Sequence, residues 1–233
     1  MPLQDVAAKV DEAQAARDWR GVLKWEGRME ELVAHLPDDF CSLILTAFSD
    51  AHHMGFLATD SKDHAHSCVR LSERRIALLG KLQRFRDQGE AMCSLANTLH
   101  RIERNKEAAT WYQRARDVGA AHGFFSLESR ACRGLGEEEV REGRHNEGLE
   151  LLRNALVAAE LNELDDPAYE LDPLQSLIQA LFHTDAIDEV EPLVLRYREA
   201  AKAQSEKGEG RFFKLSELRS IVFSARLHEV LCL

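Results

Sequence analysis

Histidine and aspartate residues gather in one short part of the sequence, and their side chains are common metal ligands and acid–base catalysts. The group comprises His52, His53, Asp60, Asp63, His64 and His66. Adjacent residues such as His52 and His53 point about 100° apart on a helix, whereas ligands that converge on a metal need i, i+3 or i+4 spacing. We therefore expect an exposed loop between two helices, with ordinary hydrogen-bonded histidines and no metal. A metal-dependent enzyme centred on His52–His66 is the alternative.

Motifs that would indicate an enzyme are missing from the rest of the sequence. The nucleophile elbow Gly-x-Ser-x-Gly, the dinucleotide-binding Gly-x-Gly-x-x-Gly and the P-loop do not occur. The stretch Gly134-Leu135-Gly136 is rich in glycine, but it lies inside an expected helix, where Gly136 would serve packing. We expect a non-enzymatic protein that needs no cofactor.

The composition limits the class of partner. The chain has 233 residues, with 30 Lys and Arg against 40 Asp and Glu, and a formal net charge of −10. This balance argues against nucleic acid, which needs clustered positive charge. No run of about 18 uncharged apolar residues occurs, and the first residues do not resemble a secretory signal. The five cysteines are widely spaced, which is typical of reduced thiols, so we expect a cytoplasmic protein with no nucleic-acid or membrane partner.

Apolar residues recur every three or four positions, which is the period of a helix with one buried face. The segments Leu149–Ala159 and Leu174–Phe182 both follow this pattern. Sustained alternation and Asn-Gly hairpin turns, which indicate strands, are absent from the sequence. The sequence therefore predicts an all-α fold.

Small or apolar residues also repeat at a nearly constant longer interval. Val22, Ala65, Ala108, Gly148 and Val190 are separated by 43, 43, 40 and 42 residues. Such a fixed interval is typical of arrays in which each repeat is one supersecondary unit that packs on its neighbours. The pattern predicts a series of helix pairs with the small residue near the start of each second helix.

Two of these repeats resemble the tetratricopeptide repeat (TPR), although their interval exceeds its usual length of about 34 residues. The matching residues are Leu135-Gly136, Gly143, Gly148, Leu152 and Ala155 in one repeat, and Leu95-Ala96, Leu99, Ala108, Tyr112 and Ala115 in another. Long repeats of this kind are similar to those of kinesin light chains and bacterial regulatory TPR proteins. The resemblance implies an α-α superhelix of about five and a half helix pairs in one domain, 1–233. The expected repeats are 3–36, 38–86, 87–123, 124–165 and 168–207, with a partial repeat at 211–233.

The resemblance also implies where a partner binds, because TPR superhelices usually hold peptides on the concave face that the first helices line. Among the residues of this chain in that register, those expected to contact the peptide are Asn97, Arg101, Arg130, Arg133, Arg141, Gln175 and Gln179. Arginine pairs bidentately with carboxylates, so the expected partner is a protein with an acidic segment or a C-terminal carboxylate. The alternative is a solvated helix face, where the arginines only pair with Glu137, Glu138 and their neighbours.

The last part of the sequence is apolar where a helical array needs a polar cap. Leu215, Leu218 and Val222 match the pattern of the fifth repeat, which predicts the first helix of a sixth repeat. One interpretation is a fragment or truncated isoform of a longer array. Another, compatible with the first, is a self-associating structural module that forms a homodimer through this end. The residues expected at that contact are Phe223, Leu227 and Leu231.

Overall fold

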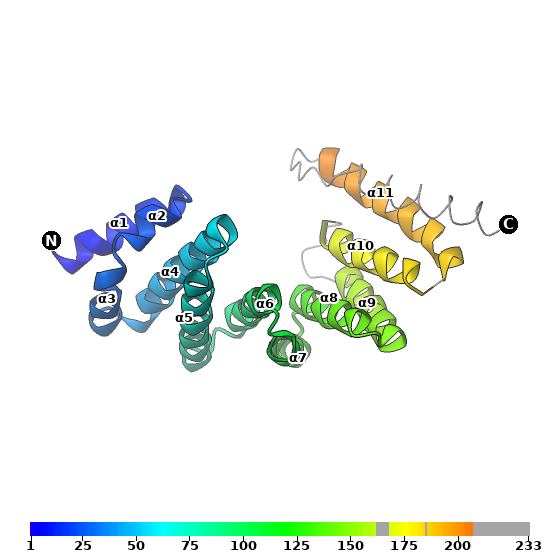
Figure 1. Cartoon of the computed structure of the whole chain (residues 1–233), viewed down its shortest axis with the longest axis horizontal. Helices are drawn as coiled ribbons and strands as arrows, with labels where there is room; N and C mark the ends of the chain where they lie inside the picture. Colours follow the sequence, from blue (N-terminus) through cyan, green and yellow to red (C-terminus); the bar gives the residue numbers. More distant parts are fainter. Residues whose placement is uncertain (162–167, 185, 207–233) are drawn as a thin grey trace. The chain divides into compact units, whose positions relative to one another are not determined.

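The computed structural model describes residues 1–161, 168–184 and 186–206. All regular structure in these ranges is helical, which confirms the all-α prediction (Figure 1). The first helices of successive pairs are α1 (Leu3–Ala15), α4 (Asp38–Thr59), α6 (Phe85–Arg101), α8 (Phe125–Arg141) and α10 (Ala168–Phe182). The second helices are α5 (Lys62–Lys81), α7 (Asn105–His122), α9 (His145–Glu160) and α11 (Val190–Glu206), the last preceded by the 3-10 turn η2 (Ile187–Glu189).

The second helix of the first pair is interrupted. It consists of α2 (Trp19–Leu23), the 3-10 turn η1 (Glu26–Arg28) and α3 (Met29–His35). The Asp18 carboxylate accepts a hydrogen bond from the backbone N–H of Gly21 at 2.9 Å, which satisfies an orphan donor at the start of α2. Asp18 therefore caps the start of α2, but this helix ends at Leu23 and the chain continues into η1.

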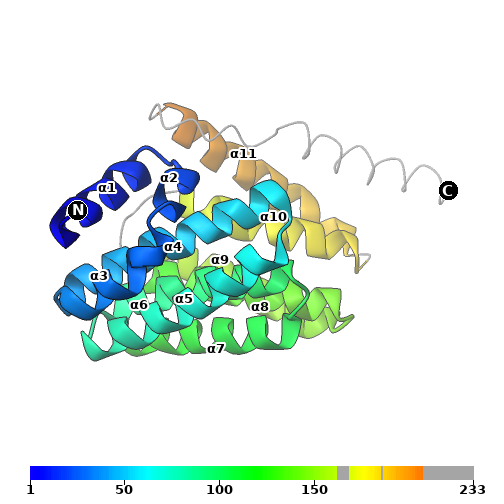
Figure 2. The same ribbon diagram turned by 60° about the vertical axis from the view of Figure 1, so that its left-hand side comes forward.

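The chain divides into two compact units, Met1–Val118 and Gly119–Leu233, and each has its own core. In the first unit, α4 runs alongside α5 in both views (Figures 1 and 2), and Phe48 and Leu71 are buried in its core. In the second unit, α8 packs along α9, and Leu152, Leu174 and Ile178 are buried between α9, α10 and α11. Removing this apolar surface from water stabilises each unit by about 25 cal/mol per Å².

The regularly spaced small residues mark the same place in each repeat. Val22, Ala65, Ala108 and Gly148 are each the fourth residue of a second helix, and Val190 is fourth counted from the start of η2. All five are buried. A small residue there allows the second helix to cross close to the first, which is why the interval is visible in the sequence.

The turns between paired helices also repeat. Arg17, Asp60, Glu103 and Gly143 each lie two residues before a second helix, and all have positive φ, from 54° to 82°. A left-handed residue that ends a helix is usually glycine, because a Cβ costs about 1–2 kcal/mol there. Only the last of these four positions carries the residue type that the backbone prefers.

We expect Glu103→Gly to raise the free energy of unfolding by about 0.5–1 kcal/mol, because relief of the left-handed strain exceeds the entropy cost of glycine. Urea denaturation followed by circular dichroism measures the change. Gly143→Ala at the equivalent turn should change stability by a similar amount in the opposite direction. Equal stabilities of Glu103→Gly and the parent chain would contradict the strain at this turn.

The expectation of an exposed loop around the histidines is wrong. His52 and His53 lie in α4, His64 and His66 lie in α5, and only Asp60 and Ser61 separate the two helices. His52 is only 3% exposed. The polar run in the sequence resembles a loop, but His52 and His53 have hydrogen-bond partners far away in the chain, and helix extends to within two residues of the turn on either side.

Candidate functional site

The second unit contains a pocket of about 650 Å³ where α8, α9 and α10 meet. We call it the α8–α10 pocket. Its lining combines three apolar side chains with ionisable and polar groups from all three helices and from the residue after α10. The lining residues are Glu137, Val140, Arg141, His145, Leu152, Ser176, Gln179, Ala180 and His183.

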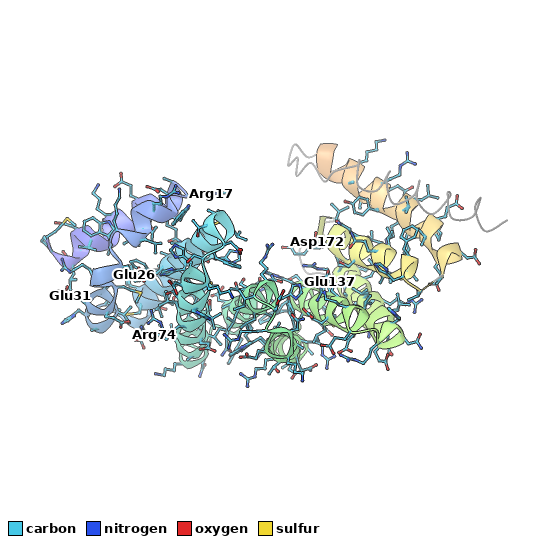
Figure 3. The ribbon with its side chains drawn as sticks, in the orientation of Figure 1. Arg17, Glu26, Glu31, Arg74, Glu137 and Asp172 are labelled. Carbon is cyan, nitrogen blue, oxygen red and sulfur yellow. The ribbon has the colours of Figure 1, made fainter. Side chains whose placement is uncertain are left out.

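Ion pairs and hydrogen bonds order the acidic side of this pocket. Arg133 pairs with Glu137 one turn along α8 at 2.8 Å, and its guanidinium lies 3.9 Å from Asp172 of α10. The hydroxyl of Ser176 donates to the same Glu137 carboxylate at 2.6 Å. Figure 3 shows Glu137 and Asp172 on these two neighbouring helices. The Glu137 carboxylate thus links the two first helices of this unit.

The basic side of the pocket is held in a similar way. Arg141 pairs with Glu138 at 2.8 Å, and the Glu138 side chain is only 5% exposed. A nearly buried carboxylate fixes the guanidinium and so directs its other N–H donors. Nδ1 of His145, which also lines the pocket, is buried and has no hydrogen-bond partner. A buried polar atom without a partner costs about 1–3 kcal/mol, which a ligand group could recover.

Two of the residues that the sequence assigned to peptide binding line this pocket, namely Arg141 and Gln179. Arg133 lies beside it through its pair with Glu137, while Arg130 and Gln175 are half-buried on α8 and α10. The ion pairs of Arg133 and Arg141 are those that the solvated-face alternative anticipated.

No pattern in the sequence indicated His145 and Ser176 as pocket residues. Their contribution depends on which turns of α8, α9 and α10 face each other, and the helical period alone does not specify this.

The other predicted contact residues belong to the first unit or lie outside the described residues. The Asn97 side-chain oxygen accepts a hydrogen bond from the hydroxyl of Tyr112, so α6 and α7 are joined at this point. Arg101 is exposed at the end of α6. The residues proposed for self-association, Phe223, Leu227 and Leu231, are not among those that the structure describes.

Two histidines of the first unit form a hydrogen-bonded chain with Glu26. Nε2 of His52 lies 2.9 Å from Oε1 of Glu26, and Nδ1 of His52 lies 3.0 Å from Nδ1 of His64. Burial lowers the pKa of His52, while Glu26 opposes this effect. Among the residues that the structure describes, no three His, Cys, Asp or Glu side chains are grouped so that they could hold a metal ion.

Four cysteines, Cys41, Cys68, Cys93 and Cys132, are buried thiols. Cys68 lies in a polar cluster with Ser49, 3.7 Å away, and Thr98, 3.8 Å away. Burial raises the pKa of the Cys68 thiol and of the Cys41 thiol. Raised pKa values disfavour the reactive thiolate, so these two residues serve packing.

No helix within the described ranges is both long enough and apolar enough to cross a membrane.

No family model matches the sequence, and no curated protein matches it. Several solved structures, however, match the fold of this chain. BtubC (BKLC) from P. vanneervenii matches with a TM-score of 0.66 at 14% identity, over 87% of this chain and 80% of that one.

Two further solved structures match this chain over most of its length. A kinesin-light-chain-like protein of nearly identical TPR-like repeats from Podosopora anserina has a TM-score of 0.60 at 16% identity, covering 87% of this chain and 96% of that one. MamA has a TM-score of 0.57 at 14% identity, covering 91% and 97%. With its successive helix pairs and these structural neighbours, the chain has a TPR-like helical-repeat fold.

Proposed function

We propose that the protein is a non-enzymatic scaffold or adaptor that binds a peptide segment of a partner protein along the first helices of its repeats. TPR-like folds in general serve protein interaction, and the α8–α10 pocket supplies a specific place for it. The observation that carries the proposal is that Arg141 and His145, whose buried Nδ1 has no hydrogen-bond partner, both line this pocket. Its ligand is an acidic side chain or a C-terminal carboxylate.

A carboxylate fits this pocket for chemical reasons. A guanidinium has five N–H donors, so its pair with Glu138 does not prevent a second carboxylate from binding. The Nδ1–H tautomer of His145 would donate to the same ligand, and charge-assisted hydrogen bonds are about twice as strong as neutral ones. Val140 and Leu152 supply apolar surface beneath, which suits the methylene groups of a bound aspartate or glutamate.

The acidic residues near the pocket do not prevent this binding. Glu137 already accepts from Arg133 and Ser176, and Glu138 already forms an ion pair with Arg141. Their charge is therefore opposed locally before any ligand arrives. We propose that the remaining contacts to the segment come from Arg130, Arg133, Gln175 and Gln179 of the same unit. Asn97 and Arg101 of the first unit stay predicted peptide contacts of their own repeat.

Selection of random peptides on the immobilised protein tests the proposal, and we expect enrichment of aspartate, glutamate or a free C-terminus. Arg141→Gln should then weaken binding of a selected peptide by about tenfold, the loss expected for one charge-assisted hydrogen bond. Fluorescence polarisation at several salt concentrations measures both the affinity and its salt dependence. The salt dependence should become weaker in the variant.

Arg153→Gln is the matched control, because Arg153 is an exposed arginine of α9 that pairs with Glu189 and does not line the pocket. It should leave the affinity unchanged. Selected peptides without acidic groups, or equal effects of the two substitutions, would contradict the proposed site. The cytoplasmic location, the absence of nucleic-acid and membrane partners and the homodimer through Phe223, Leu227 and Leu231 stay predictions.

A further inference from the structure

The helix α4 exposes large apolar side chains on the face turned away from its core. Phe40 and Leu43 are each 57% exposed, and Met54 and Leu57 are each 46% exposed. At 100° per residue these four positions fall within an arc of about 100°, along about 25 Å of the helix axis. We call this surface the α4 stripe. The stripe consists of two exposed apolar pairs, one toward each end of α4, with Asp50 and the buried Ala47 on the same arc between them. Exposed apolar patches can mark interaction sites.

The helix α4 is apolar on its core-facing side as well as at the α4 stripe. The opposite face of α4 already fills the core of the first unit with Ile44, Leu45 and Phe48. A helix that is apolar on both faces is normally buried on both. Since core packing accounts for only one face, the second face requires another explanation.

The stripe also lies in the register where this fold presents its first helices to a ligand. The small residues Ala65 and Gly148 align the second repeat with the fourth, and this alignment places Asp50 at the position of Arg133 and Met54 at that of Glu137. At these two positions α4 thus carries a carboxylate in place of a guanidinium and a methionine in place of a carboxylate. The two surfaces should therefore select different ligand chemistry.

The charged side chains that α4 itself carries are negative. The helix from Asp38 to Thr59 contains no lysine or arginine. Its carboxylates are exposed at the start, at Asp38 and Asp39, and in the middle, at Asp50, and Asp60 follows at its end. Two arginines of neighbouring helices oppose them in part: Arg75 of α5 interacts electrostatically with Asp50, and Arg101 of α6 acts on His53. The surface as a whole favours a basic partner over an acidic one.

We propose that the α4 stripe binds an amphipathic, basic helix of a partner protein. The apolar face of that helix packs along Phe40, Leu43, Met54 and Leu57, and its flanking lysines or arginines pair with Asp39 and Asp50. A stripe parallel to a helix axis suits a second helix, since ridges of side chains interdigitate in that arrangement. Methionine adapts to partners of different shape.

Two other occupants fit the charges less well. A second copy of this chain would bring the same carboxylates against each other, and like charges across an interface are costly. A membrane surface is generally anionic and would repel the aspartates. Charge complementarity therefore selects the basic helix.

Binding of a synthetic peptide to the full chain tests the proposal. The probe is a fluorescein-labelled amphipathic helix of leucine and lysine, of about 18 residues to match the length of the stripe. We expect it to bind at least about tenfold more tightly than the same peptide with glutamate in place of lysine. Asp50→Asn should reduce this preference for lysine over glutamate.

The double variant Leu43→Ser/Met54→Ser should weaken binding of the lysine peptide by about tenfold, because it removes apolar contact area. Val157→Ser is the matched control, since Val157 is a 52% exposed apolar residue on α9 of the second unit. All substituted side chains are exposed, so unfolding curves should show that each variant folds as the parent does.

Equal affinity of the parent and the double variant would overturn the proposal. So would self-association of the parent that the double variant abolishes, measured by analytical ultracentrifugation, because a second copy would then be the occupant. Arg141→Gln should leave lysine-peptide binding unchanged, so failure at the α8–α10 pocket and failure at the α4 stripe can be told apart.

Discussion

Replacing Gly148 by alanine is expected to lower the free energy of unfolding by about 1–3 kcal/mol, the usual cost of forcing an extra methyl group into a packed interior. A Cβ at Gly148 would lie 2.9 Å from the carbonyl oxygen of Gly136 and 2.9 Å from the backbone nitrogen of Val140. Both are backbone atoms of α8, so they cannot move aside as a flexible side chain would. The helices α8 and α9 would have to separate.

Two opposing effects act on the stability of the Gly148→Ala variant. Alanine is favoured over glycine inside a helix by about 1 kcal/mol, which would stabilise the variant if space allowed. The close approach of the two backbones outweighs this gain, because a Cβ at Gly136 would meet the carbonyl oxygen of Gly148 at 2.9 Å in the same way. Substituting both glycines should cost less than the sum of the single effects, since both disturb one contact.

Denaturation in urea, followed by circular dichroism, measures the effect on Gly148→Ala. The control is Gly27→Ala in η1, where a Cβ would meet no atom within 4 Å. The control should keep or slightly raise the stability of the chain. If Gly148→Ala were as stable as the control, the close contact between α8 and α9 would not exist in solution.

The same glycines show why so much of the fold could be predicted from the sequence. Each helix pair in an array repeats the same close contact between its two helices. Because that contact admits only small residues, the repeat interval is visible in the sequence at Ala108 and Gly148. The packing role expected for Gly136 is confirmed by its contact with Gly148. Local restrictions on residue size are visible in a single sequence because they do not depend on a distant partner.

Features that depend on distant partners could not be predicted. His52 looks like a loop residue beside His53, because its partner Glu26 is far away in the sequence and lies in a 3-10 turn that no pattern indicated. The α8–α10 pocket depends in the same way on Ser176 and His145, which come from different helices. Helical spacing shows which residues share a face, but not which face meets which.

The stability of the chain is expected to fall as the pH is lowered from about 7 to 5, and His52 and His53 are the reason. Burial lowers the pKa of both residues, with Arg101 adding to the effect at His53. In the unfolded chain a histidine takes up a proton near its ordinary pKa of about 6.5. Below that pH the unfolded state binds more protons than the folded state, so acid favours unfolding.

Each histidine that stays neutral in the folded state adds a slope approaching about 1.4 kcal/mol per pH unit below pH 6.5. His52→Gln removes one of them and should therefore reduce the slope of stability against pH by about half. The variant should also be less stable at pH 7.5, because Glu26 and His64 lose a hydrogen-bond partner in a nearly buried site. The slope, and not the absolute stability, is the diagnostic quantity.

Urea denaturation at pH values between 5 and 7.5 measures this slope above the range in which ordinary carboxylates titrate. The control is His66→Gln, an exposed histidine on α5, which should leave the slope unchanged. The hydrogen-bonded chain from Glu26 through His52 to His64 joins η1, α4 and α5. A parent chain whose stability does not change over this pH range would mean that His52 is accessible to protons in the folded state, and that the first repeat does not close over it.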